Sequence, residues 1–197
     1  MSPLVVVVLF FTLEVLGFNT AKGGATTVSF LNGGWWDISV ARIKEEVAKN
    51  RRTIVTVQLG HNDRHHSTKE VMAQDLAKMV EDIRGLGAEP VLVSSLVIRD
   101  FRANGKINDV LAPWVNVTTN MAKERKTHYI DLHGASLKHC EAIGANAAHR
   151  LNDGPSDTTP MVADLLNSNL GLIGINLPPI IPNRELSYNI FHGISSY

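Results

Sequence analysis

The fold is decided by the stretch Thr53-Ile-Val-Thr-Val-Gln-Leu-Gly-His-Asn-Asp63. Its first seven residues are rich in β-branched side chains and stop at Gly60, which is typical of a buried strand that ends in a turn. Functional side chains often follow such a strand, because ligands bind at the carboxyl ends of parallel strands. Asn62 and Asp63 are therefore candidates for chemistry, although both residue types also serve in ordinary turns by hydrogen-bonding their own backbone.

Strands and helices are predicted to alternate on both sides of this stretch. Further strands are expected at residues 4–11, 89–97 and 128–132, and helices at 37–50, 68–86, 111–126 and 161–167. Parallel strands need a long crossover between them, and these helices supply it. We therefore predict an α/β fold, a three-layer α/β/α sandwich with a central parallel sheet and an incomplete or altered first strand.

Composition narrows the class of protein. The 197 residues fit a single domain, residues 1–197, with an atypical apolar segment at 1–18 and an extended tail at 177–197. Lysine plus arginine and aspartate plus glutamate number 19 each, so we expect no nucleic-acid partner. The one cysteine, Cys140, excludes an internal disulfide and a cysteine zinc site. We expect a monomer.

The apolar run at residues 4–11 has two interpretations. It has the length of a signal-peptide core, but the basic residues that normally precede such a core are missing. Its β-branched residues, Val5 to Val8, favour a buried strand instead. The run is too short to span a bilayer. The tripeptide Asn116-Val117-Thr118 is an acceptor sequence for N-glycosylation, but it lies in a predicted helix and adds little to a case for secretion.

Four segments, one of them the end of the stretch quoted above, follow one another in a distinctive order. They are Asn19-Thr-Ala-Lys-Gly-Gly-Ala-Thr-Thr-Val-Ser-Phe30, Gly60-His-Asn-Asp63, Asn104-Gly-Lys-Ile-Asn-Asp-Val-Leu-Ala-Pro-Trp114 and Tyr129-Ile-Asp-Leu132. Together they resemble the rhamnogalacturonan acetylesterase branch of the SGNH (GDSL-type) hydrolases over about residues 19–166. The resemblance implies a secreted carbohydrate esterase that deacetylates pectic rhamnogalacturonan or a similar glycan without a cofactor or a metal.

The resemblance also implies roles for individual residues. The backbone N–H of Gly24 and the side-chain amide of Asn62 would form an oxyanion hole, which binds the negative charge that develops on an ester carbonyl. Asp157 would be the aspartate that orients a catalytic histidine. The acetylated polysaccharide would be the partner, as substrate or as ligand.

Two elements of the family pattern are missing from this chain. No Gly-Asp-Ser, the triplet that carries the nucleophilic serine, occurs in it, and Ser2 is no substitute because it precedes the first strand. Pro160 stands where the catalytic histidine is expected after Asp157. An alternative register, Asn146-Ala-Ala-His149, has the histidine at the right spacing but an amide in place of the carboxylate.

These departures leave three readings open. In the first, the chain is an esterase by family that is inactive or weakly active. In the second, it is a non-catalytic relative that binds a glycan or a protein. In the third, it is an incomplete gene model of an active enzyme. We expect little catalysis from the chain as it stands, because covalent catalysis needs the nucleophile and the base.

Other candidate residues have simpler interpretations. His61, His65 and His66 beside Asp63 could suggest a metal site, but adjacent side chains point apart and the resemblance accounts for His61. Aromatic residues of a small α/β domain are more often core than sugar-stacking platforms, and this applies to Trp35, Trp36 and Trp114. The sequence suggests no partner for Asp109 or Asp131.

Overall fold

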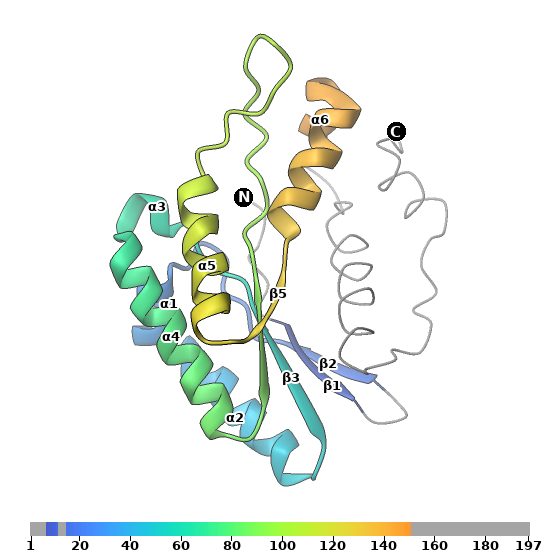
Figure 1. The fold of residues 1–197 in the computed structure, drawn as a ribbon. Helices are drawn as coiled ribbons and strands as arrows, with labels where there is room; N and C mark the ends of the chain where they lie inside the picture. The colour runs from blue at the N-terminus through green and yellow to red at the C-terminus, as the bar shows by residue number, and fades with distance from the viewer. Residues whose placement is uncertain (1–6, 12–14, 151–197) are drawn as a thin grey trace. The chain divides into compact units, whose positions relative to one another are not determined.

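The computed structural model describes residues 7–11 and 15–150 (Figure 1). The described residues form two compact units: residues 7–11, 15–95 and 112–129 make the first, and residues 96–111 and 130–150 make the second. The prediction of a single domain over 1–197 stays a prediction, and the tail at 177–197 and the helix at 161–167 lie outside the described residues.

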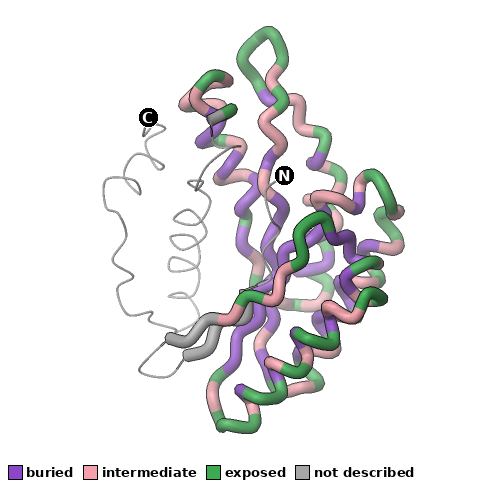
Figure 2. The backbone as a smooth tube through the Cα atoms, turned by 180° about the vertical axis from the view of Figure 1, so that it is seen from behind, coloured by how far each residue is buried: buried purple, intermediate pink, exposed green. Residues whose placement is uncertain are grey.

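The sheet confirms the α/β class. Its strands are β1 (Val7–Phe11), β2 (Val15–Asn19), β3 (Arg52–Val57), β4 (Glu89–Val93) and β5 (His128–Ile130), in the order β2-β1-β3-β4-β5. β3 and β4 are parallel, with Ile54 opposite Glu89 and Val57 opposite Leu92. Both strands are buried along nearly their whole length (Figure 2), as the run of β-branched residues at 53–59 predicts.

β1 is the altered strand of this sheet. It pairs antiparallel with both neighbours, so Val8 lies opposite Phe18 of β2 and opposite Val55 of β3. β2 therefore runs in the same direction as β3, and β1 lies reversed between them. The physical reason is the connection: residues 12–14 alone separate β1 from β2, whereas a parallel crossover needs a dozen residues or more.

Five helices belong to the first unit: α1 (Thr27–Asn32), α2 (Trp35–Ala48), α3 (Asp63–His66), α4 (Lys69–Gly85) and α5 (Ala112–Glu124). The helix predicted at 68–86 is confirmed as α4: the Thr68 hydroxyl caps its start by accepting a hydrogen bond from the Val71 N–H, and Gly87 is left-handed (φ +83°) just past its end. α2 contacts β3, whereas α4 and α5 contact β4 and each other (Figure 1).

The core of the first unit lies between these helices and the sheet. Its largest fully buried side chains include Phe30, Ile43, Met72, Leu76 and Met79. Trp36 is 4% exposed in the same core and donates its indole N–H to Asp82 at 2.9 Å, which confirms its interpretation as a core residue. Trp35 and Trp114 are half-buried and pack against the same cluster.

The second unit is organised around α6 (Leu132–Arg150), a helix that the sequence analysis did not predict. The expected strand at 128–132 ends at Ile130, because the Asp131 carboxylate accepts the Gly134 N–H at 2.9 Å and so starts the helix. α6 breaks at Gly144, whose φ of 80° and ψ of 167° are not helical. The core of this unit contains Val97, Ile107, Cys140 and Ala148.

Candidate functional site

The turn that follows β3 requires glycine at its first position. Gly60 has a φ of +109°, which side-chain-bearing residues rarely adopt. A Cβ atom there would lie 2.6 Å from Met72 Cε and 3.3 Å from Ser95 Oγ. Ser95 also donates to the carbonyl of Leu59 at 3.0 Å, which fixes the chain just before the turn. The turn is therefore held in one conformation by its buried surroundings.

Asp63 attaches this turn to the start of α1. Its side chain is fully buried, and Oδ1 accepts from the Thr27 N–H at 2.9 Å and from the Thr27 hydroxyl at 2.6 Å. Oδ2 has no hydrogen-bond partner among the described residues. Burial raises the pKa of Asp63, and the two bonds from Thr27 oppose this shift only in part. Asp63 thus joins two segments that lie 36 residues apart in the sequence.

Asn62 attaches the turn to the glycine loop. It is half-buried, and its Nδ2 donates to the carbonyl of Ala25 at 3.0 Å. Ala25 directly follows Gly24, which is exposed and left-handed with a φ of +77°. The two segments that the sequence assigned to an oxyanion hole therefore meet in the structure. An amide carries two N–H bonds, and the second one of Asn62 has no partner in the described part of the chain.

The loop that carries Gly24 is fixed at both ends. At its start, the Asn19 side chain accepts the Ala21 N–H at 2.9 Å. At its end, Thr26 and Ser29 exchange side-chain and backbone hydrogen bonds in a capping box that begins α1. Gly24 itself is exposed, and an added Cβ there would meet nothing within 4 Å.

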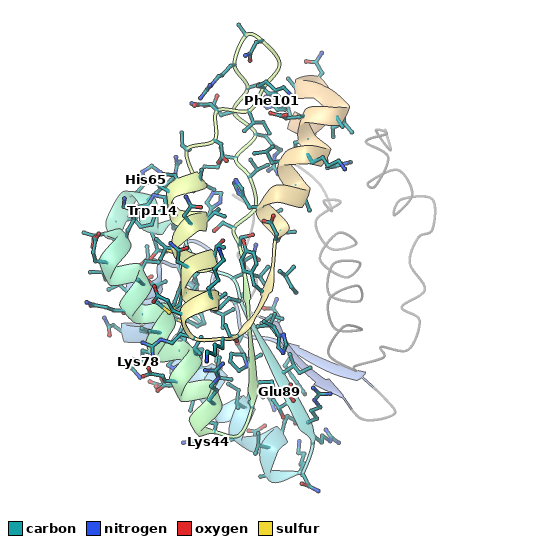
Figure 3. All side chains as sticks on the ribbon, viewed as in Figure 1. Lys44, His65, Lys78, Glu89, Phe101 and Trp114 are labelled. Atoms are coloured by element: carbon teal, nitrogen blue, oxygen red, sulfur yellow. The ribbon has the colours of Figure 1, made fainter. Side chains whose placement is uncertain are left out.

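Two histidines follow the turn on the short helix α3. His65 and His66 are exposed on α3, with ring centroids 6.0 Å apart, and Figure 3 shows His65 at that helix. Within residues 7–11 and 15–150, no group of three histidine, cysteine or acidic side chains is arranged to hold a metal ion. The same residues contain no helix that is long and apolar enough to cross a bilayer.

The residues considered for the catalytic acid and base do not lie near the Gly60–Asp63 turn in the sequence. Asp157 and Pro160 lie outside the described residues. His149, the alternative base, is exposed at the end of α6 with its ring centroid 6.2 Å from that of Phe101, and it contacts no carboxylate among the described residues. The second unit thus gives no support to the alternative register.

The structure supplies partners for the two acidic residues that had none. Asp109 pairs with the buried His133, with 2.9 Å between Oδ2 and Nε2, and Asp131 caps α6. Ser136 links His133 to the chain, because its hydroxyl donates to the His133 carbonyl at 3.0 Å and accepts the Val97 N–H at 3.1 Å. Sequence reasoning missed this pair because its members lie 24 residues apart in segments without a recognisable motif.

Comparisons with known proteins show the family and the fold of this chain. The chain is 33% identical over 144 residues to the rhamnogalacturonan acetylesterase RhgT of Bacillus subtilis (strain 168), a match that covers 72% of this chain and 60% of that protein. The crystal structure of the Bacillus subtilis protein YxiM has the same fold, with a TM-score of 0.63 and 21% identity over 79% of this chain and 45% of that one. The chain thus spans less than two thirds of either relative. The family model of the GDSL-like lipases and acylhydrolases matches residues 11–165, and the chain belongs to this family.

Proposed function

We propose that this protein binds acetyl esters on a pectic glycan such as rhamnogalacturonan, with Gly24 and Asn62 as the oxyanion hole. The hydrogen bond from Asn62 Nδ2 to the carbonyl of Ala25 carries the proposal, because it joins the two segments that would supply the donors. The 33% identity to a rhamnogalacturonan acetylesterase supports the choice of substrate. The proposal includes a secreted protein, since pectic glycans are extracellular.

The chemistry of the two donors fits an ester carbonyl. The backbone N–H of Gly24 and an amide N–H of Asn62 are neutral, so they stabilise negative charge on oxygen without adding a positive charge that would attract other anions. Asn62 is half-buried, and hydrogen bonds are stronger away from bulk water. Asp63 and Gly60 contribute by holding Asn62 in place, and neither needs to touch the ligand.

Hydrolysis would be slow in the chain as given. It contains neither Gly-Asp-Ser nor a histidine three residues after Asp157. Without a nucleophile and a base, binding and an oxyanion hole accelerate a reaction over water by about 10³ to 10⁴. We therefore expect the protein to bind the acetylated glycan but to hydrolyse it only slowly. Binding is the first property to measure.

The test compares acetylated and deacetylated rhamnogalacturonan oligosaccharides by isothermal titration calorimetry with the purified full chain. We expect tighter binding of the acetylated form and a loss of about 5- to 10-fold in Asn62→Ala, which corresponds to one hydrogen bond. Asn120→Ala is the control, because Asn120 is also a surface asparagine of the same unit and lies on α5. Equal binding of both forms, unchanged in Asn62→Ala, would show that the oxyanion assignment is wrong.

Acetate release from the same oligosaccharides separates binding from catalysis. We expect release from the wild type and from Asn120→Ala at a rate no more than about 10³- to 10⁴-fold above that in buffer, and slower release from Asn62→Ala. Two results together would instead show a working esterase with another nucleophile: acetate release by the wild type well above that rate, and a fall in release of about 10²- to 10³-fold in Asn62→Ala. In that case the oxyanion assignment would stand and the expectation of slow hydrolysis would be wrong.

A further inference from the structure

Helix α5 carries the tripeptide Asn116-Val117-Thr118 with its two polar residues on opposite sides. Asn116 is exposed, whereas Thr118 is 2% exposed. Residues two positions apart on a helix are separated by about 200° around its axis. The folded helix therefore presents the asparagine amide to solvent and buries the threonine hydroxyl.

The buried hydroxyl of Thr118 has no hydrogen-bond partner among the described residues. The neighbouring Thr119 shows the contrast, since its hydroxyl lies 3.0 Å from both the Val115 carbonyl and the Tyr129 hydroxyl. A buried polar atom without a partner destabilises a protein, and valine would fill the same volume without one. The packing of α5 therefore gives no reason for threonine at position 118.

We propose that Asn116 is an N-glycosylation acceptor and that Thr118 is present because the transfer requires its hydroxyl. In Asn-X-Thr acceptor sequences the asparagine nitrogen attacks the anomeric carbon of an oligosaccharide linked to a lipid diphosphate. A nitrogen–carbon bond forms, the bond from that carbon to the diphosphate oxygen breaks, the lipid diphosphate leaves, and the nitrogen loses one proton. The proposal requires synthesis in a eukaryotic secretory pathway and does not depend on the ester-binding function.

The burial of Thr118 also determines when the transfer occurs. A transferase must reach both the asparagine and the hydroxyl, and α5 packs against α4 and β4 with Thr118 on its buried face. The modification therefore precedes the folding of this helix. Afterwards the glycan projects from the exposed side of α5, where Asn120 lies one turn farther along. Figure 3 shows α5 with Trp114 labelled on it.

The experiment expresses the full chain behind a cleavable secretory leader in yeast. Occupancy of Asn116 is measured by mass spectrometry before and after peptide N-glycosidase digestion. We expect one glycan on the wild type, and none on Asn116→Gln or Thr118→Val. Asn120→Gln is the matched control, because this exposed asparagine of the same helix is followed two residues later by Ala122, and the variant should keep the glycan. Thr118→Ser should also keep it, because serine retains the hydroxyl.

A second measurement tests the role of the hydroxyl without any glycan. Wild type and Thr118→Val made in bacteria are compared by thermal denaturation. We expect a melting temperature about 2 to 4 °C higher for Thr118→Val, because it removes a buried polar atom without a partner. An unmodified Asn116 in the secreted wild type would overturn the glycosylation site. A lower melting temperature for Thr118→Val would overturn the argument that folding does not need the hydroxyl.

Discussion

The Gly60–Asp63 turn and the β1–β2 hairpin lie in the same unit, but different interactions determine their conformations. The turn is held by partners from distant parts of the chain, including Thr27 and Ala25 on one side and Met72 and Ser95 on the other. The hairpin is determined by the shortness of one connection, residues 12–14. The two oxyanion segments meet in a sheet whose first strand is reversed.

The largest expected effect concerns the direction of β1, which engineered disulfides can measure. In the antiparallel register Phe10 lies opposite Thr53, and Val8 lies opposite Val55. We expect Phe10→Cys with Thr53→Cys to cross-link nearly completely under oxidation, because directly opposite Cα atoms are about 4.5 to 5.5 Å apart. The yield is measured by mass spectrometry of peptides, which also distinguishes the new bond from any that involves the native Cys140.

Phe10→Cys with Val57→Cys is the control pair, and it should cross-link only if β1 ran parallel to β3. If β1 ran parallel to β3 with Val8 still opposite Val55, Phe10 would lie opposite Val57 instead of Thr53. Phe10→Cys with Val57→Cys should therefore remain reduced, because four residues along a strand separate the two partners by about 13 Å. Cross-linking of this pair and not of the first would show that β1 runs parallel to β3 and that the antiparallel register is wrong.

The next largest effect is expected for Gly60→Ala, which tests the rigidity of the turn. The variant combines an unfavourable φ of +109° with a Cβ that lies 2.6 Å from Met72 Cε. Met72 is fully buried, so its side chain can move only by displacing its neighbours. We expect a loss of about 2 to 4 kcal/mol in the free energy of unfolding, measured by urea denaturation. A loss below about 0.5 kcal/mol would show that the turn adapts.

A smaller effect is expected for Gly24→Ala in the loop on the other side of the site. This glycine also has a positive φ, +77°, but a Cβ there would meet nothing within 4 Å. The substitution therefore adds backbone strain alone, and we expect a loss of about 1 kcal/mol by the same measurement. Alanine keeps the backbone N–H, so binding of acetylated oligosaccharide should change less than in Asn62→Ala. A loss equal to that of Gly60→Ala would mean that steric contacts do not distinguish the two glycines.

The contrast between the Gly60–Asp63 turn and the β1–β2 hairpin also shows which features could be predicted from the sequence. Local composition predicts the strand at 53–59 and the helix of residues 68–86. The ordered set of motifs places the loop that carries Gly24 beside the turn that carries Asn62, and in the structure Asn62 bonds to Ala25 of that loop. The reversal of β1 also follows from the shortness of its connection, but only once β2 is recognised, and Val15–Asn19 lacks the alternation that marks a strand.

The features that were missed depend on tertiary contacts. Residues 132–150 contain glycines at 134 and 144, which weaken a helix prediction, and the helix is stabilised by the Asp131 cap and by burial of Cys140 and Ala148. The short helix α1 could have been found from its capping box, although serine replaces the usual glutamate or glutamine at the fourth position. The bonds between Asp63 and Thr27 have no signal in a single sequence.

The smallest expected effect is the pH dependence that Asp63 gives to stability. Its pKa is raised above the ordinary value of 3.8 by burial, so the folded state binds the proton more tightly than the unfolded state does. Well below pH 3.8 both states are protonated and this preference stabilises the fold in full. As the pH rises, the unfolded carboxyl ionises first, and the free energy of unfolding falls until the folded carboxyl ionises too.

Asp63→Asn removes this titration while keeping an oxygen that can accept both bonds from Thr27. The stability of the wild type relative to Asp63→Asn should therefore decrease as the pH rises above the ordinary carboxyl pKa of 3.8, as measured by urea denaturation at several pH values. If the difference in the free energy of unfolding between the wild type and Asp63→Asn stays constant with pH, Asp63 has the same pKa in the folded and the unfolded state. A difference that grows in favour of the wild type would mean that the bonds from Thr27 outweigh burial, and that the turn holds Asp63 as a stabilised carboxylate.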